Sequence, residues 1–343
     1  MVGRMAAVGI IEFANLNVTY RDPKDATKRI GLLARPEHVL PLFFDPAPRV
    51  LRKGSPAVFF IYRAVALEVA HEVYGIAFEF VRVRDLKSHM RYVAGNLVSK
   101  ERELEDDACS GIGLLVLNDH SLAYVGRTPF SPSLEQLRST LRRGARDRWQ
   151  RELQTRVAHL SLPEQQQELR VLRTKEPAPT IDVVRFKAKV SLLEALKEFD
   201  VLRRVELQVV APNPDEIDMP KGILGDIMRA RVALKATSAT LVQVNTGGLD
   251  KDAVATELAA VSENKTTHVT LKGLNPDGGK LTRKDQHVAL TEHADFATED
   301  PVAASKPLFG KLQGLFEDYA KKTHDLRDRA KTVFDWLKKG PPQ

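Results

Sequence analysis

The segment Glu176-Pro-Ala-Pro-Thr180 constrains the fold of this 343-residue chain more than any other. Two prolines two positions apart cannot continue a helix, and each holds the residue before it in extended backbone. A chain of this length also exceeds what one ordinary hydrophobic core accommodates, so two domains are expected. The segment therefore predicts a joint between a first domain at 1–130, followed by a basic helical connector at 131–175, and a second domain at 180–300.

The first domain is predicted to be an antiparallel β-sheet that carries helices. Residues 76–83 alternate between apolar and polar side chains, as a half-buried strand does. Residues 113–126 predict a β-hairpin that turns near Asn118-Asp119. Residues 56–75 fit a helix and a buried strand about equally well, because their apolar residues recur at both spacings, so both interpretations remain open.

The second domain is predicted from an alternation of short strands and helices. Strand patterns occur at 183–190, 203–211, 240–245, 268–272 and 287–290, and helix patterns at 192–199, 223–235 and 250–261. This order indicates an α+β protein whose second domain is a mixed α/β sandwich, with a ferredoxin-like arrangement as one form of it.

The C-terminal region is predicted to be one long amphipathic helix. Residues 301–307 are interpreted as a second linker, and the helical unit at 305–339 has apolar residues at heptad-like positions from Leu308 to Leu337. Its apolar side would pack on the chain's own core, which is the favoured interpretation, or bind a partner protein or a second copy of the chain.

Basic residues are concentrated in one segment. The net charge is +7, and between Arg127 and Pro177 eleven basic side chains stand against six acidic ones, so this segment carries +5. Its helix, capped by Ser133, contains the arginines predicted to bind DNA or RNA: Arg138, Arg142, Arg143, Arg146 and Arg148. Guanidinium groups pair with phosphate oxygens through two N–H donors. At 100° per residue these arginines do not form one stripe, so a solvated helix with local salt bridges is the alternative.

The best candidates for catalysis are three carboxylates. Metal-dependent nucleases place Asp and Glu at strand ends with a lysine nearby. Glu206 falls within a predicted strand, and Asp215 and Asp218 follow it in a proline-rich turn. The upstream aspartate of such a site is not evident, and Asp182 is a poor substitute. Turn residues beside a solvated strand face explain the pattern more simply.

Other chemistry lacks a sequence signature. The chain has no Gly-x-Ser-x-Gly turn, phosphate-binding glycine loop or His-Glu-x-x-His motif, so neither a cofactor nor a metal site is predicted. The sole cysteine, Cys109, excludes an intrachain disulfide. With no apolar run of about 20 residues and no secretory signal, a cytoplasmic protein without membrane segments is expected. Whether the protein is an enzyme stays open, and a non-catalytic protein is favoured.

Two segments carry a resemblance. Ile11-Glu-Phe-Ala-Asn-Leu-Asn-Val-Thr19, together with Val269-Thr-Leu-Lys-Gly-Leu-Asn-Pro-Asp-Gly-Gly279, is similar to uncharacterised bacterial proteins found near phage-defence and mobile-element genes. The resemblance transfers no functional residue. It implies sensing or binding of phage components, nucleic acid among them, beside a partner effector. The leading hypothesis is a non-catalytic nucleic-acid-binding or sensing component of a bacterial phage-defence system. The alternatives are a metal-dependent nuclease and an oligomeric scaffold or effector that acts through protein contacts.

Overall fold

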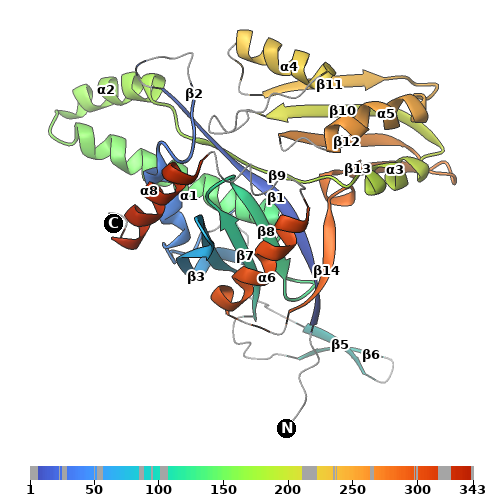
Figure 1. Ribbon diagram of the computed structural model, residues 1–343, viewed down its shortest axis with the longest axis horizontal. Coiled ribbons are helices and arrows are strands. Elements are labelled where there is room, and N and C mark those ends of the chain that lie inside the picture. Colours follow the sequence, from blue (N-terminus) through green and yellow to red (C-terminus); the bar gives the residue numbers. More distant parts are fainter. Residues whose placement is uncertain are drawn as a thin grey trace.

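The computed structural model of the protein describes residues 7–22, 24, 29–49, 51, 57–84, 89–93, 96–100, 107–210, 222–234, 236, 238–262, 266–296, 298, 300–315 and 326–340. Its elements form a larger curled sheet and a smaller four-stranded sheet that lie beside each other (Figure 1). In the described part of the chain, every helix is too short or too polar to cross a membrane.

The larger sheet has eight strands, and its neighbouring strands run antiparallel. Its strands are β1 (Ala7–Arg21), β2 (Arg29–Ile30), β3 (Ala57–Ala70), β4 (Val73–Arg84), β7 (Asp107–Val116), β8 (Ser121–Gly126), β9 (Thr180–Arg185) and β14 (Thr291–Phe296). The main path runs β14-β1-β8-β7-β4-β3, and β2 and β9 also pair with β1. A separate hairpin consists of β5 (His89–Val93) and β6 (Asn96–Lys100).

Both faces of the larger sheet are buried under helices. On β7, Ile112 and Leu114 point into a core shared with α6 (Pro301–Gly314), whereas Leu115, on the other face, belongs to a core shared with α1 (Leu134–Val157) and α8 (Arg327–Lys338). Alternate residues of a strand point to opposite faces, so a strand covered on both sides needs apolar residues at nearly every position. This requirement explains why Ile112–Val116 of β7 and Leu122–Val125 of β8 contain no polar side chain facing away from the core.

In the part of the chain that the structure describes, helices cover one face of the smaller sheet. The sheet runs β11 (Ser238–Val244), β10 (Val201–Val210), β12 (Thr267–Leu274) and β13 (Lys280–Lys284), with antiparallel neighbours. The helices are α3 (Lys189–Lys197), α4 (Gly222–Ala233) and α5 (Lys251–Ser262). All three contribute to one core with β10 and β12. This confirms a mixed sheet-and-helix unit. It does not confirm a ferredoxin-like arrangement, because the central pair β10 and β12 runs antiparallel.

Several local predictions are confirmed. For residues 56–75 helix and strand both remained open, and the described residues of this range form β3 and the start of β4. The hairpin of β7 and β8 turns at 117–120, as predicted. Helix α1 begins at Ser133, whose hydroxyl accepts a hydrogen bond from the Gln136 amide while the Gln136 side chain accepts one from the Ser133 amide. The chain continues into a second helix, α2 (Leu162–Lys175), within the helical connector predicted at 131–175.

Two strand predictions in the second half are wrong at their ends. The strand predicted at 183–190 stops at Arg185, and α3 begins at Lys189. No strand forms at 287–290: His287 ends the 3-10 helix η3 (Asp285–His287), and β14 begins only at Thr291. Lys187 and Ala289 form an isolated bridge between these segments, so the apolar pattern there reflects burial rather than a continuous strand.

The pairing of β9 and β14 differs from the organisation expected for residues 180–300. Both strands pair with β1, β14 over Ala7–Glu12 and β9 over Ala14–Thr19. The prolines after α2 end that helix, but they do not determine which strand the following segment joins. The chain therefore enters the larger sheet before it builds the smaller one, and returns to it afterwards.

The single long C-terminal helix is not confirmed. Residues 301–307, interpreted as a linker, are the first turns of α6, where the Asp300 carboxylate accepts hydrogen bonds from the amides of Val302 and Ala303. The second helix of this region, α8, is short, and residues 316–325 lie outside the described ranges. The favoured packing is confirmed, because α6 and α8 each bury an apolar side on the larger sheet.

Candidate functional site

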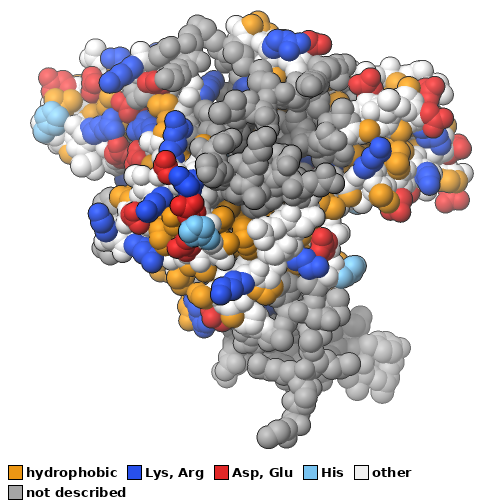
Figure 2. Space-filling view, viewed as in Figure 1, with side chains coloured by type: hydrophobic (Ala, Val, Ile, Leu, Met, Phe, Trp, Pro, Cys, Tyr) orange, Lys and Arg blue, Asp and Glu red, His pale blue; other side chains and the backbone are white. Residues whose placement is uncertain are grey.

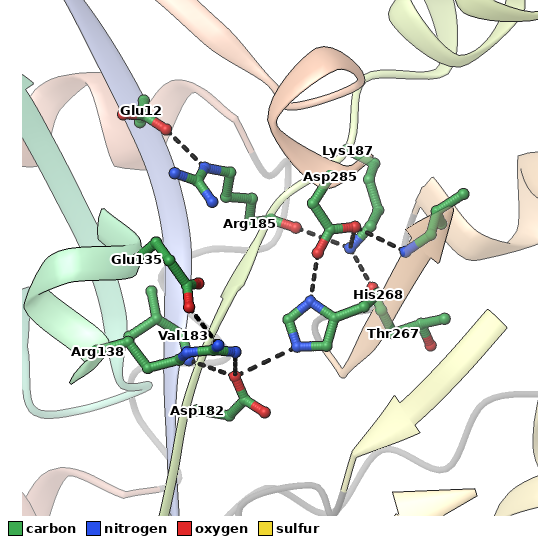
Figure 3. Close-up of polar contacts among 11 residues, drawn as sticks. Glu12, Glu135, Arg138, Asp182, Val183, Arg185, Lys187, Thr267, His268 and Asp285 are labelled. Carbon is green, nitrogen blue, oxygen red and sulfur yellow. Dashed lines mark hydrogen bonds and ion pairs between the residues drawn. The ribbon is translucent and has the colours of Figure 1, made fainter. Parts of the chain in front are cut away.

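A cluster of charged side chains joins the two sheets where β9, β12 and α1 meet (Figure 3). His268 of β12 lies between two carboxylates: its Nε2 is 3.3 Å from Asp182 Oδ1 on β9, and its Nδ1 contacts Asp285 Oδ2 at the start of η3. Arg138 of α1 donates from Nη1 to the same Asp182 oxygen over 2.9 Å and also pairs with Glu135. We call Arg138, Asp182, Lys187, His268 and Asp285 the inter-sheet cluster.

Lys187 is the buried member of the inter-sheet cluster. Its side chain is fully buried, and its Nζ donates to the carbonyl oxygens of Arg185, over 3.0 Å, and of Thr267. The same Nζ is 3.6 Å from Asp285 Oδ1, which also accepts a hydrogen bond of 2.7 Å from the Val269 amide. Burial lowers the pKa of Lys187, and the charge and hydrogen bond of Asp285 oppose that shift only in part. The carbonyls and the carboxylate give the buried amino group its polar partners.

The pKa values in the cluster favour the charged forms of His268 and both aspartates. Burial alone would lower the pKa of His268, but hydrogen bonds and charges from Asp182 and Asp285 raise it to about 9. Burial would raise the pKa of Asp182, yet His268 and Arg138 lower it to about 2. The pKa of Asp285 is also lowered, since Lys187 and His268 outweigh its burial.

The inter-sheet cluster forms a structural connection between the two sheets. At neutral pH His268 is an imidazolium, and each of its ring nitrogens faces a carboxylate. A histidine in this state has no free lone pair with which to accept a proton, so it cannot act as a general base there. The arrangement holds β12 and η3 against β9 and α1.

Of the three catalytic candidates, the described residues include only Glu206. Its Oε1 accepts a hydrogen bond of 2.9 Å from Lys272 Nζ and another from Arg204 Nε. The hydrogen bond from Lys272 is the main reason that the pKa of Glu206 is lowered, and burial opposes it. Asp215 and Asp218 lie outside the described residues, so the predicted trio stays a prediction. Within the described ranges, no group of three or more His, Cys, Asp and Glu side chains is placed to hold a metal ion.

The five predicted nucleic-acid-binding arginines divide into three environments. Arg138 belongs to the inter-sheet cluster. Arg148 is half-buried near His38, whose pKa its charge helps to lower. Arg142, Arg143 and Arg146 are exposed on the side of α1 that faces away from the core. The helical projection anticipated this spread, but it did not identify Arg138 as the member held by an aspartate from β9.

Comparison with protein-family models and with curated proteins finds no match for the chain. The interpretation of function therefore rests on the arrangement of the side chains described above.

Proposed function

We propose that the protein is a non-catalytic nucleic-acid-binding protein that contacts phosphates through Arg142, Arg143 and Arg146 of α1. The observation that carries the proposal is the exposure of these three side chains within two turns of one helix. Arg142 and Arg146 are four residues apart and so lie one above the other on the helix surface. When a nucleic acid binds such a group of cations, it releases condensed counterions, and this release favours binding.

The helix that presents these arginines is well anchored. Leu137, Leu141 and Ala145 are buried in the core of the larger sheet, and the capping box at Ser133 secures the first turn. Arginines on a fixed helix lose less freedom on binding than arginines on a mobile loop, so more of their interaction with phosphate appears as affinity. Asp147 is also exposed on this helix, and its carboxylate reduces the net positive charge beside Arg146.

The alternatives have weaker support. A nuclease would need Glu206 beside other metal ligands, whereas its carboxylate is held by Lys272 and Arg204. A scaffold that acts through the C-terminal region would need an available apolar side, whereas α6 and α8 bury theirs. We also propose that this binding serves phage defence, a role that follows from the resemblance of the two short segments and not from the arrangement of the side chains.

The experiment is fluorescence anisotropy with labelled DNA and RNA over a series of salt concentrations. Replacement of Arg142, Arg143 and Arg146 by alanine should lower the slope of log affinity against log salt by about 2 to 3, since each phosphate contact contributes about 0.7 to 0.9. The control replaces exposed lysines on other elements: Lys197, Lys306 and Lys331. No binding by the unaltered protein at low salt would end the proposal.

A further inference from the structure

The smaller sheet has an open face opposite its helices. On β10, Val205, Leu207 and Val209 point into the core formed with α3, α4 and α5. Arg204, Glu206 and Gln208 alternate with them and so point to the other side of the sheet. The strand register extends this open face across the sheet, with Thr240, Val242 and Val244 of β11, Thr270 and Lys272 of β12, and Lys280, Thr282 and Lys284 of β13.

The open face is basic, and its outer strands are more exposed than its centre. Exposed residues include Thr240, Val242, Val244, Lys280, Thr282 and Lys284, whereas Arg204, Glu206, Thr270 and Lys272 are half-buried. Apart from His268, which belongs to the inter-sheet cluster, the open face contains four basic side chains and one carboxylate: Arg204, Lys272, Lys280 and Lys284 against Glu206. Glu206 pairs with Arg204 and Lys272, so Lys280 and Lys284 are the exposed cations of this face that have no carboxylate partner among the described residues. On the side of the molecule seen in Figure 2, by contrast, acidic and basic side chains are interspersed where atoms are coloured.

The inter-sheet cluster connects this open face to the arginines of α1. His268 precedes Thr270 and Lys272 in the open-face row of β12, and Asp182 links it to Arg138 (Figure 3). Arg142 lies one helical turn beyond Arg138 on the same side of α1. The cluster therefore fixes the two basic surfaces relative to each other.

We infer that a single strand of nucleic acid binds along the open face of β11, β10, β12 and β13, as an extension of the surface proposed on α1. The inference rests on that proposed function and names its substrate class. Lysines and arginines of this face contact phosphates, and its threonine hydroxyls donate to phosphate or sugar oxygens. None of its side chains is aromatic, so bases gain no stacking platform and binding is independent of sequence.

The shape of the face favours a single strand over a duplex. Proteins that read a duplex insert a helix or a β-ribbon into a groove, and a flat sheet face offers no such projection. Four strands span about 14 Å from the first to the last at a spacing of about 4.8 Å. A flexible single strand can follow this surface with successive phosphates, whereas a rigid duplex contacts a flat surface along one line only.

The test compares two charge reversals of equal size by anisotropy, with labelled single-stranded RNA, single-stranded DNA and a duplex of the same sequence. Lys280→Glu with Lys284→Glu alters the open face, and Lys197→Glu with Lys306→Glu alters exposed positions on α3 and α6. We expect the first pair to lower the salt slope for the single strand by about 1.4, the contribution of two phosphate contacts, and the second pair to leave it unchanged. The unaltered protein should bind the single strand more tightly than the duplex.

The outcomes separate this inference from the proposed function. If the α1 arginine variant weakens binding but the two charge-reversal pairs behave alike, the inference is overturned and the proposed function stands. Equal affinity for single strand and duplex also overturns the inference. Binding of neither by the unaltered protein overturns both. Thermal melting of each variant, expected to match the unaltered protein because all four lysines are exposed, shows that the fold is retained.

Discussion

His268 Nε2 lies 3.3 Å from Asp182 Oδ1, and this contact ties the smaller sheet to the larger one. The two residues are 86 positions apart in the chain and come from strands of different sheets. Because Asp285 holds the other ring nitrogen and Arg138 holds Asp182, the connection depends on ionised groups on both sides. The stability of the protein should therefore respond to pH at this point.

Alkaline pH should weaken the connection. The pKa of His268 is about 9 in the folded protein and about 6.5 in an unfolded chain, so its stabilising contribution is complete below pH 6.5 and is lost as the pH rises through 9. The pKa of Asp182 is lowered to about 2, so its contribution is present above pH 4 or so and is lost as the pH falls through 2. Urea unfolding should show a decline on the order of 2 kcal/mol between pH 6.5 and pH 9.

The matched variant is His268→Gln, which can still form hydrogen bonds but does not titrate. Its free energy of unfolding should be lower at pH 6.5 and nearly level between pH 6.5 and pH 9. If the variant and the unaltered protein declined in parallel over this range, another group would be responsible and the assignment to His268 would be wrong.

Replacement of Asp285 by alanine should be strongly destabilising. The change leaves the buried Lys187 ammonium and the His268 imidazolium without their shared carboxylate. Removal of one partner from a buried ion pair costs about 3 to 5 kcal/mol. Asp277→Ala, in the exposed turn between β12 and β13, is the control and should change the free energy of unfolding by less than about 0.5 kcal/mol. Equal losses in chemical denaturation would contradict the role assigned to Asp285.

Local structure was largely predictable, because its causes are local. The hairpin at 113–126 and the start of α1 at Ser133 depend on alternation, turn residues and a cap within a few positions. The inter-sheet cluster was not predictable in this way. Asp182 and His268 look like solvated residues of ordinary strands, and only the pairing of β9 with β1 brings them together. A charged residue inside an apolar strand was the one available signal, and it does not identify its partner.

The prediction of one long C-terminal helix differs from the structure for another reason. Apolar residues at Leu308, Leu312, Val333 and Leu337 fit one helical period, so the pattern favoured a single long helix. Their burial is divided between the two faces of the larger sheet, where α6 and α8 occupy separate cores. Periodicity reports which side of a helix is buried, but not whether two helices bury it against the same surface.

The position of α8 predicts that it serves the chain's own core. The Phe334 ring lies 4.8 Å from the Tyr74 ring of β4 between centroids, and its side chain is buried. Phe334→Ala should lower the free energy of unfolding by about 3 to 5 kcal/mol, whereas Lys331→Ala on the exposed side of α8 should change it little. Light scattering after size exclusion should give the same mass for both variants. A change of assembly with unaltered stability would instead favour a partner-binding helix.

Arg138 and Arg142 should behave in opposite ways, although they lie one turn apart on α1. Arg138→Ala removes a hydrogen-bonded partner of the half-buried Asp182, so it should cost about 1 to 3 kcal/mol of stability. Because its guanidinium is already held by Asp182 and Glu135, its loss should leave the salt dependence of nucleic-acid binding nearly unchanged. Arg142→Ala removes an exposed side chain, so its stability should be retained while the salt slope falls by about 0.7 to 0.9.

The two measurements, urea unfolding and the salt dependence of anisotropy, separate structural from binding arginines within a single helix. Arg138→Lys refines the comparison, because it keeps the positive charge beside Asp182 but loses the second contact to Glu135. Its stability should fall between that of the unaltered protein and that of Arg138→Ala. Arg138→Ala could instead lower the salt slope as much as Arg142→Ala while the protein stayed stable. That result would mean that, in the unaltered protein, Arg138 exchanges its hydrogen bond to Asp182 for one to a phosphate when nucleic acid binds. The inter-sheet cluster would then belong to the binding surface itself rather than to its support.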